Sequence, residues 1–426
     1  MRILLLVIAL LLSFSSHAGY AIVLQDETAL RPAPGAAARP NAVLYQGETV
    51  EVRGERLDYL RVWDYTRERG GYVRASQVRR LALEPAEAPE LLAILRFLRG
   101  MPGSEALGIG IAAAYIEAVP PEALEGAEVL DIMGVLAERL ARKGSGSHLE
   151  VVARYGVRFL TVERYGRMRL CYDGAAYRRL LAMRTTEEQR ARAMLALSEP
   201  SCLKPEITLA QLLDGTDESA LPGYLRNRIL MRRASVWASV AYQRARQGED
   251  AASAAQSAAK AFLAINREEL AEADQAVYAE TQTRVGAVRV ALAPPPSTEK
   301  PLHIATAPGE PGQTCVMLVD AKKKELARRC TYGHVWPATA VVNGAANALA
   351  VAVQPTESWR ELWVFRKGKS GWTVRVVPPA ASSPGVGYAD FAGWTSGGIR
   401  VTRQAIVGNR LQITRITYPV RNSAAS

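Results

Sequence analysis

Short runs in which apolar and polar residues alternate mark the first part of the chain. They are rich in β-branched and aromatic side chains and occupy residues 21–24, 49–53, 59–63 and 71–73. Turn-forming residues separate them, namely Pro32, Pro34, Gly35, Gly47, Gly54, Gly70 and Gly71. Alternation puts every second side chain on one face of a strand, and Gly and Pro mark the turns between strands. The pattern predicts a small β-barrel domain over residues 19–83.

Residues 84–293 carry a helical pattern instead. The stretch is rich in Ala, Leu, Arg and Glu, and its apolar residues at helical spacing form two stripes: Ile229, Val236 and Val240, then Val277, Thr281, Val285, Val288 and Leu292. We expect an all-α domain of several antiparallel helices, either a solenoid or an irregular bundle. The Gly- and Ser-rich break at 143–147 ends one helix and offers Ser147 as the cap of the next.

A proline-rich linker at 294–301 interrupts the helical pattern. Beyond it, strand-like runs recur between turn signals, at residues 314–319, 326–331, 349–353, 362–366, 373–377, 398–402 and 411–416. They predict an antiparallel all-β domain over 302–426. The expected fold class of the whole chain is therefore multidomain α and β.

The first 18 residues have the pattern of a cleaved signal peptide. Arg2 supplies the positive start, and the apolar run at 3–12 is too short to cross a bilayer. Ser16 and Ala18 then form a small-x-small cleavage site. We expect a product without a transmembrane segment, located in the periplasm or secreted.

The chain is basic, with a formal net charge of +11. An exported protein meets anionic envelope polymers rather than nucleic acid, so we expect no nucleic-acid partner. The arginines form no long run, and a solvated basic surface explains the charge equally well.

Four cysteines, Cys171, Cys202, Cys315 and Cys330, form an even set, which three disulfide connectivities could satisfy. Local pairing is the simplest. A hairpin that places Cys315 opposite Cys330 also places Val319 opposite Leu326, and its strands bring the two sulfurs together. Cys171 and Cys202 would then form the second bridge. No C-x-x-C spacing occurs, so we expect structural disulfides.

The first domain also resembles the bacterial SH3-like (SH3b) family of exported proteobacterial proteins. That family has a proline-containing opening, a G-x-x-V-x-V strand, an aromatic-x-x-V strand and a closing G-W-V, which here read 29–34, 47–52, 59–62 and 71–73. Tyr72 stands where the family has tryptophan. The resemblance implies a barrel that binds a peptide or glycan. We expect its aromatic residues to form the ligand platform, with about half of them buried in the core: Tyr45, Tyr59, Trp63, Tyr65 and Tyr72.

The last domain weakly resembles TolB-like β-propellers at residues 361–365 and 391–394, which read ELWVF and FAGW. About 125 residues follow the linker, whereas four blades need roughly 40 residues each. We therefore expect blade-like meanders or a compact sandwich rather than a closed propeller.

Catalytic motifs are absent from the sequence. Residues 108–113 match G-x-G-x-x-A, and Glu128 follows at about the spacing of a ribose ligand. Because the surroundings are helical, we interpret these small residues as helix packing. The histidines His148, His303 and His334 stand in three different contexts without a metal-binding motif. We expect no metal and no cofactor, and we expect glutamates such as Glu163 and Glu187 to be solvated or paired.

The sequence therefore predicts a non-catalytic protein of the cell envelope. Its SH3-like domain would bind peptidoglycan peptide or a protein partner, and the other domains would act as a scaffold. Two alternatives remain open, a peptidoglycan hydrolase with an unrecognised carboxylate site and an envelope assembly factor.

Overall fold

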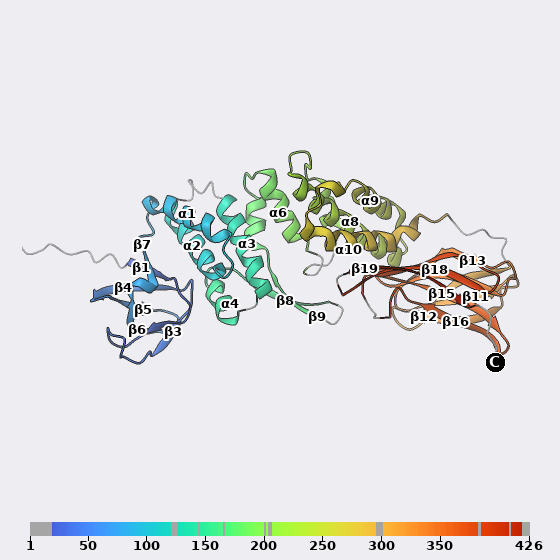
Figure 1. Cartoon of the computed structure of the whole chain (residues 1–426), viewed down its shortest axis with the longest axis horizontal. Coiled ribbons are helices and arrows are strands. Elements are labelled where there is room, and N and C mark those ends of the chain that lie inside the picture. Colours follow the sequence, from blue (N-terminus) through green and yellow to red (C-terminus); the bar gives the residue numbers. More distant parts are fainter. Residues whose placement is uncertain are drawn as a thin grey trace, which may run out of the picture. The chain divides into compact units, whose positions relative to one another are not determined.

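A computed structural model describes residues 19–120, 127–143, 145–164, 167–199, 202, 207–294, 301–381, 385–408 and 410–419. Strands come first along the chain, helices follow, and strands return at the end (Figure 1). The chain forms two compact units, which divide between Ala196 and Leu197, inside the helical part. The predicted signal segment lies outside the described residues.

The N-terminal strands form an antiparallel five-stranded sheet in the order β6-β5-β4-β1-β7. These strands are β1 (Gly19–Val23), β4 (Thr49–Arg56), β5 (Tyr59–Asp64), β6 (Arg69–Arg74) and β7 (Val78–Leu81). A separate hairpin, β2 (Thr28–Leu30) and β3 (Ala42–Leu44), joins β6 through main-chain hydrogen bonds between Arg31 and Tyr72. The four predicted strands are present. The closed barrel that we expected is not shown, because β6 and β7 remain the two edges of the sheet.

Helices cover the rest of the first unit, which also holds a hairpin that the sequence did not predict. The helices are α1 (Ala88–Arg99), α2 (Glu105–Ala118), α3 (Ala127–Lys143), α4 (Gly146–Ala153), α5 (Ala175–Leu181) and α6 (Glu187–Leu197), the last crossing the division between units. Strands β8 (Phe159–Arg164) and β9 (Arg167–Tyr172) pair between α4 and α5, so this region is not all-α. Ser145, rather than Ser147, occupies the N-cap position of α4.

Small residues of α2 allow the close packing predicted for the G-x-G-x-x-A stretch. A Cβ atom on Gly108 would lie 2.5 Å from Leu136 Cδ1 of α3. One on Gly110 would lie 2.8 Å from Ile22 Cδ1 and 2.9 Å from the carbonyl oxygen of Gly47, both outside the helix. The glycines therefore bring α2 against α3 and against the N-terminal sheet.

Polar contacts also attach this sheet to the helices. Tyr155, which follows α4, donates a hydrogen bond to the carbonyl oxygen of Gly47 at 2.6 Å and contacts Thr49 Oγ1 at 2.7 Å. The buried carboxylate of Glu48 accepts hydrogen bonds from both Arg67 and Arg154. The N-terminal sheet is therefore part of the first unit rather than a free module.

The second unit begins with helices α7 (Ile207–Asp214), α8 (Gly223–Gln247), α9 (Ala252–Leu263) and α10 (Gln275–Val288). The predicted stripe Ile229, Val236 and Val240 is buried along α8. The second predicted stripe is buried only in part. Thr281 and Val288 are buried and Val285 is half-buried, whereas Val277 and Leu292, at its ends, are 50% and 40% exposed.

The C-terminal strands form two sheets. One is three-stranded, with β10 (Leu302–Pro308), β11 (Thr314–Asp320) and β12 (Glu325–Thr331). The larger sheet has the order β13-β14-β15-β17-β18-β19, and β16 pairs with β15. Its strands are β13 (His334–Val342), β14 (Ala348–Thr356), β15 (Trp359–Gly368), β16 (Gly371–Val377), β17 (Gly387–Trp394), β18 (Gly398–Val407) and β19 (Arg410–Pro419). All seven predicted strands are present, and the one parallel pairing among the described strands is β15 with β17.

Side chains of both C-terminal sheets share one hydrophobic cluster, which includes Val316 and Leu318 of β11 and Leu349 and Val351 of β14. Ala350, between the last two, belongs to a second cluster. Since neighbouring residues of a strand face opposite sides, β14 is covered on both faces. This explains why the strand reads as a continuous apolar run rather than an alternating one.

Cys315 and Cys330 face each other in the β11–β12 ladder and form a disulfide, as the hairpin pattern predicted. The expected pairing of Val319 with Leu326 is wrong. A register shift after Leu318 places Val319 opposite Glu325, and Leu326 packs against the core cluster. Cys171 and Cys202 are also disulfide-bonded, so none of the four cysteines is free.

Candidate functional site

The outer face of strands β4, β5 and β6 gathers most of the aromatic residues selected from the sequence. Leu60 and Val62 of β5 point into the core cluster of the N-terminal sheet, so Tyr59, Arg61 and Trp63 face the other side. The ladder register sets Trp63 between Glu51 and Gly70, Arg61 opposite Tyr72, and Tyr59 opposite Arg74. We call this surface the aromatic–arginine face.

At one end of this face, Trp63 stacks with an arginine. The Arg53 guanidinium lies 4.5 Å from the centre of the Trp63 ring. Glu51 accepts hydrogen bonds from Arg53 Nε and from the Tyr65 hydroxyl, each at 2.9 Å, and these bonds lower the pKa of the Glu51 carboxyl. Gly70 lies beside the indole, where an added Cβ would be 3.2 Å from Trp63 Cε3. The Trp63 ring is thus held in place by a charged neighbour.

At the other end, a pocket of about 310 Å³ surrounds Tyr59. Its lining residues are uncharged or basic: Gln25, Ala29, Arg31, Tyr59, Arg74, Ser76 and Gln77. Arg74 Nη2 donates to the Tyr59 hydroxyl at 3.3 Å, and its guanidinium lies 5.7 Å from the ring centre. Two guanidinium groups and no lining carboxylate make this pocket suited to a negatively charged group.

The structure brings four of the five selected aromatic residues to this region. Tyr59 lies in the pocket and is only 4% exposed, Trp63 and Tyr72 are half-buried on the same face, and Tyr65 follows β5 with 63% exposure. Tyr45 comes from the turn between β3 and β4, and not from the strands of the aromatic–arginine face.

The arginines of the face were not selected from the sequence. Arg61 and Arg74 stand opposite Tyr72 and Tyr59 in the β5–β6 ladder, and Arg53, at the bulge of β4, lies over the Trp63 ring. The alternation that placed the aromatic side chains could also have indicated these arginines. Arg31 could not have been found in this way, because it reaches the pocket through the bridge between β2 and β6.

The described histidines lie in separate surroundings. His148 Nε2 lies 2.8 Å from Asp26 Oδ1, and His303 lies in β10. His334 stacks edge-on against Trp336, and burial together with the positive charge of Arg246 lowers the pKa of His334 to about 4. Among the described residues, no three His, Cys, Asp or Glu side chains are grouped so that they could hold a metal ion.

The acidic residues considered in the sequence are accounted for individually. Glu128 pairs with Arg96 at 2.8 Å, Glu187 lies 3.7 Å from Arg190, and Glu163 is exposed. The hydrogen bonds from Arg96 lower the pKa of the Glu128 carboxyl.

Within the described part of the chain, none of the helices combines the length and the apolar character needed to cross a membrane. Comparison with protein-family models, with curated proteins and with solved structures finds no match to this chain.

Proposed function

We propose that this is a non-catalytic, exported protein of the cell envelope whose N-terminal sheet is an SH3-like module that binds the stem peptide of peptidoglycan. One observation carries the proposal, namely the basic pocket around Tyr59 at the end of the aromatic–arginine face. Stem peptides carry free carboxylates, which guanidinium groups bind in a forked geometry. Aromatic faces beside the pocket offer flat apolar surface for the rest of the peptide.

The order of sequence motifs along β1 to β6 supports the SH3-like assignment. The helices of the first unit support the module through Glu48 and Tyr155, and the remainder of the chain would act as a scaffold. A periplasmic or secreted location fits the disulfides, because such bonds persist in oxidising compartments.

Sedimentation with purified peptidoglycan sacculi tests this proposal. The double variant R31Q/R74Q removes both pocket cations, and we expect it to weaken binding at least about tenfold. R80Q is the matched control. Arg80 lies on β7, outside the pocket, and its exposed ion pair with Glu55 contributes little stability. Equal binding by the double variant and the control would show that the pocket is not the binding site.

The same experiment distinguishes the other two candidates. Soluble muropeptides released from the sacculi would indicate a hydrolase. Absence of sedimentation, together with specific crosslinking to an envelope protein, would indicate an assembly factor. Either result would replace the proposal.

A further inference from the structure

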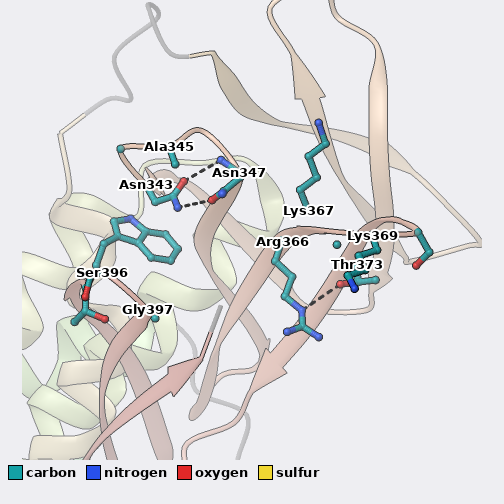
Figure 2. A pocket seen from close by; sticks show the side chains of 15 residues that line it. Asn343, Ala345, Asn347, Arg366, Lys367, Lys369, Thr373, Ser396 and Gly397 are labelled. Carbon is teal, nitrogen blue, oxygen red and sulfur yellow. Dashed lines mark hydrogen bonds between the residues drawn. The ribbon is translucent and has the colours of Figure 1, made fainter. Parts of the chain in front are cut away.

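Three turns at one end of the larger C-terminal sheet surround a pocket of about 660 Å³. They connect β13 to β14, β15 to β16, and β17 to β18. Figure 2 shows residues of all three turns around the pocket, among them Asn343, Lys369 and Ser396. This pocket belongs to the second unit and does not involve the aromatic–arginine face.

Hydrogen bonds fix the conformation of these turns. The side-chain oxygen of Asn343 accepts from the main-chain N–H groups of Asn347 and Ala348, each at 3.0 Å, while its amide donates to Asn347 Oδ1 at 2.6 Å. The main-chain N–H of Lys367 in β15 donates to the carbonyl oxygen of Asn347 at 2.9 Å and so connects this turn to the neighbouring strand. The wall formed by the β13–β14 turn is therefore in place before any ligand binds, which lowers the entropic cost of binding.

The pocket is positively charged. Arg366, Lys367 and Lys369 line it, and no lining residue is acidic. Within the described ranges, none of these three cations has an ion-pair partner, and Arg366 donates only to the Thr373 hydroxyl, at 3.4 Å. Such unneutralised cations in one pocket favour a negatively charged ligand.

The cations are distributed along the pocket rather than converging on one point. Arg366 and Lys367 are neighbours on β15, and their side chains extend to opposite sides of the strand (Figure 2). A single small anion could not contact all three. Contact with all of them requires an extended ligand that crosses the end of the sheet and carries acidic groups at intervals.

Trp394 adds an aromatic surface to the same pocket. The ring packs against Phe391 and the second cluster of the sheet, and its indole N–H is buried there. A ligand would therefore contact the ring and not the N–H. Hydroxyl and amide side chains continue the polar lining, including Asn343, Ser370, Thr373 and Ser396.

We propose that this pocket binds an acidic oligosaccharide, with carboxylated sugars spaced along the cations. One indole face and a lining of hydroxyl and amide groups match a sugar ring, which has apolar C–H faces and hydroxyl edges. A single-stranded nucleic acid is a poorer match, because its binding sites stack successive bases on several aromatic residues. The pocket would give the protein a second ligand, separate from the peptide bound at the N-terminal sheet.

Calorimetric titration of the purified protein with a hyaluronan tetrasaccharide tests the proposal, with neutral chitotetraose as the comparison ligand. We expect saturable binding with a dissociation constant below about 1 mM, and at least tenfold weaker binding of the neutral sugar. The variant K367Q/K369Q should weaken binding of the acidic sugar at least tenfold.

The control variant K322Q/K323Q removes two exposed lysines from the β11–β12 turn, away from the pocket. It should bind within twofold of the unchanged protein, and so should R31Q/R74Q, which keeps this test separate from that of the peptide site. Three results would overturn the proposal. They are equal affinity for both sugars, a loss of affinity in K322Q/K323Q equal to that in K367Q/K369Q, and tighter saturable binding of a single-stranded oligonucleotide.

Discussion

Arg360 Nη2 donates a hydrogen bond to Oδ1 of Asp390 at 2.7 Å, and the other N–H groups of the guanidinium donate to main-chain oxygens. Its Nε donates to Ala287 at 2.7 Å and its Nη2 to Gly286 at 3.2 Å, both in α10, while Nη1 donates to Ala389 of β17 at 3.3 Å. The side chain is 1% exposed. One buried guanidinium thus connects α10 to the larger sheet within the second unit.

We expect Arg360→Met to reduce the free energy of unfolding of the second unit by about 3–5 kcal/mol, because it leaves three main-chain carbonyls without this donor and Asp390 with only the exposed Arg289. Arg289→Ala is the matched control. Arg289 binds the same carboxylate but is 67% exposed, so its loss should cost at most about 1 kcal/mol. Urea unfolding followed by tryptophan fluorescence measures both, since six of the seven tryptophans follow Leu197. Similar costs for the two variants would contradict this role for Arg360.

Glu48 should be as important to the stability of the first unit as Arg360 is to that of the second. Glu48→Gln replaces a buried carboxylate that binds Arg67 at 2.9 and 3.0 Å and Arg154 at 3.4 Å. We expect a loss of about 3 kcal/mol, because Arg154 loses this counter-charge and Arg67 keeps only that of Asp64. Glu55→Gln, at an exposed ion pair with Arg80, should change stability by less than about 1 kcal/mol. Thermal unfolding followed by circular dichroism compares the two variants. An equal shift of the midpoint temperature would show that Glu48 does not connect the sheet to the helices.

Replacing Gly110 by a larger residue should destabilise the first unit. Gly110→Ala places a methyl group within 3 Å of Ile22 Cδ1 and of a main-chain oxygen, and we expect it to destabilise the first unit by about 1–3 kcal/mol. Gly146→Ala, also in a helix, meets no atom within 4 Å. It should be neutral or stabilise by up to about 1 kcal/mol, because alanine restricts the unfolded chain. Chemical denaturation of both variants tests the pair, and a neutral Gly110→Ala would mean that α2 can move away from the sheet.

The second unit should become less stable as the pH is lowered from about 6.5 to about 4. In the folded protein the pKa of His334 is lowered from 6.5 to about 4 by burial and by Arg246. The unfolded chain therefore binds a proton in this window that the folded chain does not, so acid favours unfolding there and the effect is absent above the window. At pH 4 the difference amounts to about 3 kcal/mol.

His334→Gln should remove this part of the pH dependence, whereas His303→Gln in β10 should leave it unchanged. Urea unfolding at several pH values measures the slope. An unchanged slope in His334→Gln would assign the pH dependence to other groups.

Regular alternation and turn residues were sufficient to predict most strands. They failed where the local signal was weak. Pro337 interrupts β13, whose pairing also shifts between Trp336 and Val341, so the run does not look like a strand. Strands β8 and β9 were missed because they are short and lie between helices, in a region whose composition favoured helices.

The candidate site was predictable only in part. Outward aromatic positions on β5 and β6 follow from alternation, but the pairing of Tyr59 with Arg74 depends on the β5–β6 register. The attachment of the sheet to the helices depends on contacts between residues far apart in the chain, such as Thr49 and Tyr155. No local pattern encodes such a contact, because it forms only when the elements pack.

The contacts of Gly110, Tyr155 and Glu48 also have a mechanical consequence. They meet at one place, the turn at Gly47 and Glu48, which both α2 and the residues after α4 contact. A pulling force on a molecule held at Tyr59 would pass along β5 and β4 into this turn. The first unit would therefore transmit such a load to its helices largely through one point of attachment.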